Sequence, residues 1–343
     1  MKRIRKNLII PSSAYILSKK QIRYYEYIEK APEIGDVIYG QIIRIGQHSK
    51  IENKNGRLHN LYDGLKTIFV FGNRYATDYY EGIIPDSFQP EIDMISRSGV
   101  ICKTVNKNTN IKDPTIIKIL GYVLNENEEI VNTRKHFLSK NNRKKDNKDK
   151  ERAKLILNIG TSMNAGKSMT AATCCRCLKA ANYSVMGSKI TGTASLKDIL
   201  NMQDSGAETI NDFTFLGFPS TYLLEEKDLL DIFKYIENKC DSSSYKYWIV
   251  EIADGVIQRE TAILLKNETI RKRIHKLILS TPDCFSAIGG TKVLKEKFDL
   301  VPDAISGVCS SSPLGVIELK SILNIPVFDN INPVHKELLN ILE

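Results

Sequence analysis

The sequence of 343 residues predicts two domains: a small β-rich, barrel-like domain and then a doubly wound α/β domain with a mainly parallel sheet. Three observations predict this architecture. The chain is longer than most single hydrophobic cores. Short apolar runs separated by turn residues fill residues 32–138. From residue 154 onward, apolar runs alternate with helical periodicity. We expect the domains to span 1–138 and 154–343, with residues 139–153 as a charged linker.

Five short strands are predicted in the first domain, and no long helical pattern interrupts them, which is typical of a small β-barrel. They are Val37–Gly46, Thr67–Phe71, Gly82–Pro85, Val100–Val105 and Ile116–Leu124. The segment Asn53–Gly56 has the composition of a hairpin turn.

In the second domain the predicted strands are mostly apolar along their length, as strands buried on both faces of a parallel sheet must be. They are Leu155–Ile159, Tyr183–Ile190, Tyr247–Ile252, Lys276–Ser280, Ala304–Val308 and Pro326–Phe328. Helical periodicity is clearest over Ser168–Ala181 and Glu225–Lys239. The alternation of strand and helix predicts the doubly wound fold.

Composition places the chain among soluble globular proteins, with 42% hydrophobic and 26% charged residues. The sequence has no apolar run near the roughly 18 residues needed to cross a bilayer. The run Leu8–Ile10 after the basic start is too short for a secretory signal. We therefore expect a cytoplasmic protein without a membrane partner, whose seven cysteines are reduced core thiols.

The net charge of +9 is concentrated in one place. Residues 140–154 carry eight basic and three acidic side chains, a net of +5, and no aromatic residue on which a base could stack. This pattern favours a solvated linker, so a nucleic-acid partner is not expected.

The strongest indication of function is a glycine-rich segment between the predicted strand Leu155–Ile159 and the helix that follows. It reads Gly160-Thr161-Ser162-Met163-Asn164-Ala165-Gly166-Lys167-Ser168. Such a turn presents backbone N–H groups and a helix N-terminus to phosphate oxygens. We assign nucleotide binding to Gly160, Thr161, Met163, Asn164, Ala165, Gly166, Lys167, Ser168 and Met169. Lys167 is expected to neutralise the β- and γ-phosphates and Ser168 to bind Mg²⁺. Five residues, rather than the usual four, separate the two glycines.

The pattern Gly-Thr-x₄-Gly-Lys-Ser resembles the variant phosphate loop of dethiobiotin synthetase and its relatives among P-loop NTPases. The segment Ser188–Thr193 is similar to that family's Lys-Pro-Val-x-[Ser/Thr]-Gly segment, which implies that Lys189 points into the active site. The likeness also implies an acidic metal ligand at a strand end, and Glu251 fits that place. The resemblance covers residues 154–335 and leaves the β-rich domain unassigned.

Such relatives carry a second acidic metal ligand after the lysine of the second strand. Asp204 and Asp212 both qualify, and the sequence leaves the choice between them open. Where relatives place an asparagine that recognises the base, this chain has Ser310–Pro313. The resemblance implies ATP with Mg²⁺, and GTP is kept as an alternative.

These observations together predict a Mg-ATP-dependent enzyme that performs phosphoryl transfer or ligation on a small anionic metabolite. Lys167, Lys189 and Glu251 are its predicted catalytic residues. The alternative is a regulatory NTPase whose β-rich domain engages a protein or nucleic acid. A homodimer is also kept open. The segment Phe218–Tyr222 has two interpretations, a cover over a substrate or a cap on the helix that follows.

Overall fold

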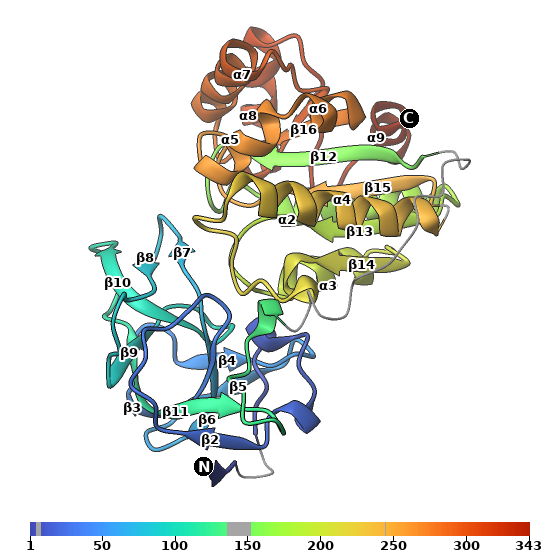
Figure 1. The fold of residues 1–343 in the computed structure, drawn as a ribbon. Coiled ribbons are helices and arrows are strands. Elements are labelled where there is room, and N and C mark those ends of the chain that lie inside the picture. The colour runs from blue at the N-terminus through green and yellow to red at the C-terminus, as the bar shows by residue number, and fades with distance from the viewer. Residues whose placement is uncertain (5–7, 136–151, 244) are drawn as a thin grey trace. The chain divides into compact units, whose positions relative to one another are not determined.

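The computed structural model describes residues 1–343 except 5–7, 136–151 and 244 (Figure 1). The charged linker expected over 139–153 thus lies almost entirely outside the described residues. Contacts divide the chain into two compact units. Unit 1 holds the described residues of 1–145 together with 192–196 and 213–223, and unit 2 holds the remainder. The sequence-based boundaries did not anticipate these two later segments of unit 1.

Unit 1 consists mainly of β-strands joined by tight turns. The strands are β1 (Lys2–Arg3), β2 (Tyr24–Glu26), β3 (Val37–Arg44), β4 (Lys50–Glu52), β5 (Leu58–Asn60), β6 (Lys66–Phe71), β7 (Arg74–Tyr75), β8 (Tyr80–Ile83), β9 (Glu91–Met94), β10 (Val100–Lys107) and β11 (Thr115–Leu124). Five of them close a ring in the order β3, β6, β10, β9, β11 and back to β3. Within this ring β6 and β10 are parallel and the other pairs antiparallel.

Strand β6 of this ring is buried on both faces over Thr67–Phe71, which explains its near-continuous apolar sequence. In β6, Phe69 and Phe71 belong to one buried cluster, whereas Ile68 and Val70 belong to a second. Successive side chains of a strand point to opposite faces. The second cluster includes residues of the N-terminal segment such as Leu17. The strand therefore lies between two apolar layers.

Unit 2 is built on a six-stranded, fully parallel sheet. Its strands are β12 (Lys154–Gly160), β13 (Val185–Lys189), β14 (Thr209–Asp212), β15 (Tyr247–Glu251), β16 (Ile274–Ser280) and β17 (Ala304–Ser306). They are ordered β14-β13-β15-β12-β16-β17. The edge strand β14 was not predicted. The predicted strand Pro326–Phe328 forms only a single bridge, between Ile305 and Val327.

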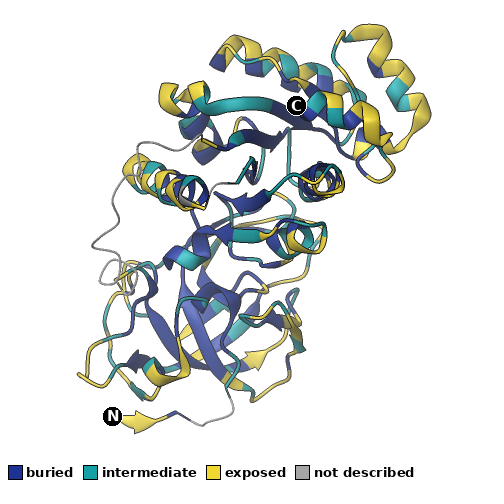
Figure 2. Cartoon of the chain, turned by 90° about the vertical axis from the view of Figure 1, so that its right-hand side faces the viewer, coloured by how far each residue is buried: buried dark blue, intermediate teal, exposed yellow. Residues whose placement is uncertain are grey.

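Helices join these strands. They are α2 (Lys167–Ala180), α3 (Lys197–Asp204), α4 (Glu226–Ser242), α5 (Arg259–Lys266), α6 (Glu268–Arg273), α7 (Cys284–Phe298), α8 (Pro313–Ile322) and α9 (His335–Leu342). Figure 2 shows buried strands with helices whose outer faces are exposed. Cys174 and Cys175 of α2 pack against Ile156 and Ile249 of the sheet. In the part of the chain that the structure describes, no helix has the length and hydropathy of a membrane span.

The sheet has a point at which its strand order reverses. From β12 the chain proceeds to β13 on one side, whereas β16 and β17 lie on the other side. In doubly wound sheets, ligands bind at the carboxyl ends of the strands beside such a point. The turn between β12 and α2 lies at this place.

Candidate phosphate-binding site

The turn from Gly160 to Lys167 folds around the lysine side chain. Lys167 Nζ donates a 2.7 Å hydrogen bond to the carbonyl oxygen of Ser162. A Cβ atom on Gly160 would stand 2.9 Å from the Lys167 side chain, so a larger residue there would displace the lysine. Asn158, buried in β12, donates to Lys167 O at 2.6 Å and accepts from the Ser280 hydroxyl at 2.9 Å. These bonds fix the first residue of α2 against the sheet.

Gly166 allows the turn to enter the helix. Its φ of 97° lies in the left-handed region, and a Cβ atom there would be 2.8 Å from Gly307 Cα. The N–H of Val308 donates to Ala165 O at 3.2 Å, which holds the turn against the segment after β17. The N–H groups of Met163, Ala165 and Gly166 donate to no backbone carbonyl within the described residues. This is the arrangement that an anion-binding turn needs.

Charged residues end three neighbouring strands at the same level of the sheet. Lys189 of β13 pairs in register with Asp212 of β14 and with Glu251 of β15. Their exposed fractions are 5%, 0% and 2%, so all three are buried. The structure thus brings together Lys189, Glu251 and one of the two candidate aspartates.

Asp198, in the first turn of α3, completes the cluster. Its carboxylate accepts hydrogen bonds from Ser168 Oγ at 2.9 Å and from Lys189 Nζ. Ser168 Oγ also lies 3.1 Å from Glu251 Oε1, a second acceptor. The sequence analysis missed Asp198. The other candidate, Asp204, is exposed at the last residue of α3 and is not part of this cluster.

Burial and mutual charge set the protonation of these groups. Burial raises the pKa of Glu251 to about 7, and the negative charge of Asp198 adds to this effect. Burial also opposes ionisation of Asp198 and Lys189, but their mutual attraction prevails. The pKa of Asp198 is therefore lowered and that of Lys189 is raised. Burial lowers the pKa of Lys167. Lys189 and Asp198 thus form a largely buried ion pair, and Glu251 beside it is about half protonated near pH 7.

The donor set fits Mg²⁺ bound together with phosphate. Ser168 Oγ, Asp198 Oδ1 and Glu251 Oε1 are neighbouring oxygens of the kind that this ion prefers. Glu251 Oε2 is buried and accepts no hydrogen bond from the described residues, so this acceptor is available to a ligand. Within the described residues, no group of three or more His, Cys, Asp and Glu side chains forms a metal cage. A magnesium ion here would need phosphate and water ligands as well, as is usual for this ion.

The remaining predicted residues lie along the same turn. Thr161 begins it, and its N–H donates to Ser280 O at 3.1 Å. Asn164 is exposed and has a φ of 59°, while Ala165 is fully buried. Met169, in the first turn of α2, is 45% exposed.

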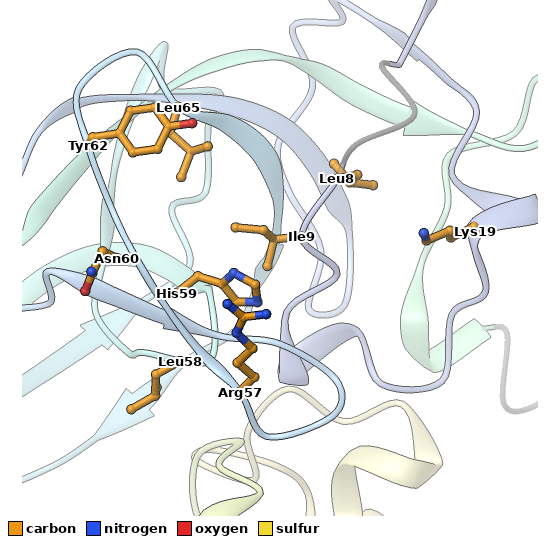
Figure 3. Close-up of a pocket in the computed structure, with 9 residues that line it drawn as sticks. All are labelled: Leu8, Ile9, Lys19, Arg57, Leu58, His59, Asn60, Tyr62 and Leu65. Atoms are coloured by element: carbon orange, nitrogen blue, oxygen red, sulfur yellow. The ribbon is translucent and has the colours of Figure 1, made fainter.

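Unit 1 has a pocket of its own, of about 510 Å³ (Figure 3). Lys19, Arg57 and His59 give it basic character, and Leu8, Ile9, Leu58, Tyr62 and Leu65 supply apolar surface. Asn60 completes the lining, and Tyr62 is 61% exposed. No residue of the phosphate cluster lines this pocket. Since its charged side chains are exposed, we assign it no function.

The parallel sheet, with a glycine-rich turn that leads into a helix at its point of reversal, is a doubly wound α/β fold. This confirms the fold predicted for the second domain.

Comparisons with known proteins add only distant likenesses. No protein-family model matches the chain, and no curated protein does. Among solved structures it is similar to the signal recognition particle receptor FtsY from Elizabethkingia anophelis in complex with GDP, at 11% identity over 61% of this chain and 70% of that chain, with a TM-score of 0.40. FtsY from Mycoplasma mycoides gives 14% identity over 61% and 73% of the two chains and a TM-score of 0.38. At these values the likeness carries no argument, and the assignment rests on the topology and the turn.

Proposed function

We propose that unit 2 binds a nucleoside triphosphate with Mg²⁺ and transfers or hydrolyses its terminal phosphate. One observation supports this most: Lys167, Ser168, Lys189, Asp198 and Glu251 meet at the carboxyl edge of the sheet. Two cationic side chains suit the charge of a polyphosphate, and the oxygens suit its metal ion. Phosphoryl transfer needs positioning and charge neutralisation and no protein nucleophile.

Each residue has a defined role in this proposal. Lys167 binds the β- and γ-phosphate oxygens from the first turn of α2. Ser168 and Glu251 hold the metal ion, with Asp198 as the second acidic group. Magnesium, when bound, neutralises charge on the phosphate oxygens. Because the residues around these groups are buried, the electrostatic interactions are stronger than they would be in water.

The second buried lysine favours an enzyme with a small anionic substrate. Lys189 stands beside the proposed phosphate position and faces three carboxylates. A carboxylate, carbamate or hydroxyl oxygen of the substrate would attack the terminal phosphorus, and the bond to the nucleoside diphosphate would break. This is the dethiobiotin synthetase-like chemistry that the sequence motifs imply. ATP is the proposed nucleotide, and GTP is the comparison.

Calorimetric titration of the full chain with Mg-ATP and Mg-GTP tests nucleotide binding. Lys167→Ala should abolish binding of the preferred nucleotide, because it removes the cation inside the turn. Lys179→Ala is a matched control, since Lys179 lies on the same helix with its side chain 50% exposed in a surface ion pair. Unchanged affinity in Lys167→Ala would contradict the proposal.

A partner-regulated NTPase is the second candidate. The segments that follow β13 and β14 belong to the β-rich unit, so this unit is suited to respond to the nucleotide. Turnover that rises with small carboxylic acids would support the enzyme, and turnover that rises only with a protein or nucleic acid would support the regulator. Light scattering with and without nucleotide would test the proposed homodimer.

A further inference from the structure

After β13 and again after β14, the chain leaves the carboxyl edge of the sheet and contributes a short segment to unit 1. The first excursion, Gly192–Leu196, follows β13, and the second, Phe213–Leu223, follows β14. Residues of the phosphate cluster flank both. Lys189 ends β13, Asp198 comes two residues after Leu196, and Asp212 directly precedes Phe213. Two of the connections between residues of the cluster therefore pass through unit 1.

The first excursion is fixed along its length by hydrogen bonds. Gly192 N–H donates to Thr221 Oγ1 at 2.8 Å and Gly192 O accepts from Thr221 N–H at 2.9 Å. Ala194 N–H donates to Pro219 O at 3.0 Å. The second excursion is itself held by Thr133, whose hydroxyl donates to Gly217 O at 2.6 Å. The two segments thus form one bonded layer of unit 1.

Glu52 of β4 fixes the end of this layer. Its Oε2 accepts a 3.0 Å hydrogen bond from the N–H of Leu196. Glu52 is 5% exposed and Leu196 2%, so water does not compete freely for either group. A backbone N–H bonded to a buried carboxylate makes a strong hydrogen bond, and leaving it unpaired is costly. Only Lys197 separates Leu196 from Asp198.

We propose that Glu52 is a positioning residue of the nucleotide site. It holds Leu196, where the chain enters α3, so that Asp198 pairs with Lys189 and with Ser168. The effect on nucleotide binding rests on the function proposed above, whereas the effect on α3 does not.

Hydrogen–deuterium exchange of the full chain without nucleotide tests the positioning directly. Glu52→Ala should raise exchange of the α3 amides about tenfold, because Leu196 loses its acceptor. Glu52→Gln keeps a carbonyl oxygen and should retain wild-type exchange. Glu91→Ala is the matched control, an exposed glutamate of the same unit. If Glu52→Ala does not fold, Glu52→Asp, which is shorter by one methylene, replaces it in the comparison.

Calorimetry with the preferred Mg-nucleotide tests the consequence. Glu52→Ala should raise Kd and the half-saturating Mg²⁺ concentration about tenfold with unchanged stoichiometry, and Glu52→Gln should restore both. Lower stoichiometry with unchanged Kd would show a purely structural role and overturn the inference. Wild-type exchange of α3 in Glu52→Ala would also overturn it. If the wild-type chain binds no nucleotide while α3 still responds, the positioning stands and the proposed function fails.

Discussion

Replacing Glu251 by glutamine should make the nucleotide-free protein more stable above neutral pH. Burial raises the pKa of this carboxyl from 4.5 to about 7. At about 1.4 kcal/mol per pH unit, this shift corresponds to about 3.5 kcal/mol of stability. Because the folded protein binds this proton more tightly than the unfolded chain does, the free energy of unfolding decreases as pH rises from 4.5 to 7. The loss in the free energy of unfolding reaches its full value above pH 7.

Glutamine has the same shape and no titrating proton, so Glu251→Gln should lose this pH dependence. Its free energy of unfolding should match that of the wild type at about pH 4 and exceed it by up to about 3.5 kcal/mol at pH 8. Mg-nucleotide affinity should fall, as expected when a functional residue is retained at a cost in stability.

Urea denaturation in EDTA, followed by tryptophan fluorescence, measures this difference. The single tryptophan, Trp248, is buried in β15, the strand that ends at Glu251, so it reports on unit 2. His48 of unit 1 has a pKa lowered to about 3, so its contribution to stability is lost as pH falls below about 6.5. This opposite trend cancels in the comparison between variants. Glu226→Gln, on an exposed residue of α4, is the control. Parallel pH profiles of wild type and Glu251→Gln would refute the reasoning.

Three further substitutions test the site. Asp198→Asn should weaken Mg-nucleotide binding at least about tenfold, whereas the exposed Asp204→Asn should leave it unchanged in the same titration. Gly166→Ala should cost about 1–3 kcal/mol by thermal unfolding, because φ is 97° and Gly307 blocks the added Cβ; an unshifted melting curve would contradict this. Ser168→Ala should raise the half-saturating Mg²⁺ concentration about tenfold but spare metal-free nucleotide binding, and equal loss of both would be inconsistent with a metal ligand.

Strong apolar runs allowed much of the fold to be predicted. The segments that became β12, β15 and β16 are buried on both faces, so their sequences are distinctive. Among the short strands that the sequence analysis missed, β9 and β14 show the opposite case. In β9, Glu91 and Asp93 interrupt the apolar pattern, and β14 is an edge strand of four residues that includes Asn211 and Asp212.

The sequence predicted those residues of the candidate site that belong to a local motif. Lys167 and Ser168 follow from the turn, and Lys189 and Glu251 from the ends of apolar strands. Asp198 belongs to no such motif. An aspartate in the first turn of a helix usually only stabilises the helix N-terminus, so its position alone does not indicate a site residue. Its role depends on the path of the chain after Lys189, which passes through unit 1. Glu52 was beyond prediction for the same reason, because 144 residues separate it from Leu196.

The two segments Gly192–Leu196 and Phe213–Leu223 also limit where the chain can be cut into separate fragments. A single cut after the first 150 residues would leave Phe213 and Leu216, both buried and both part of unit 1, on the severed C-terminal fragment. That fragment would present apolar surface to water and would be prone to aggregate. The β-rich unit is translated first, but its last segment, Phe213–Leu223, is complete only when translation reaches residue 223. Completion of the first unit must therefore wait for translation well into the second.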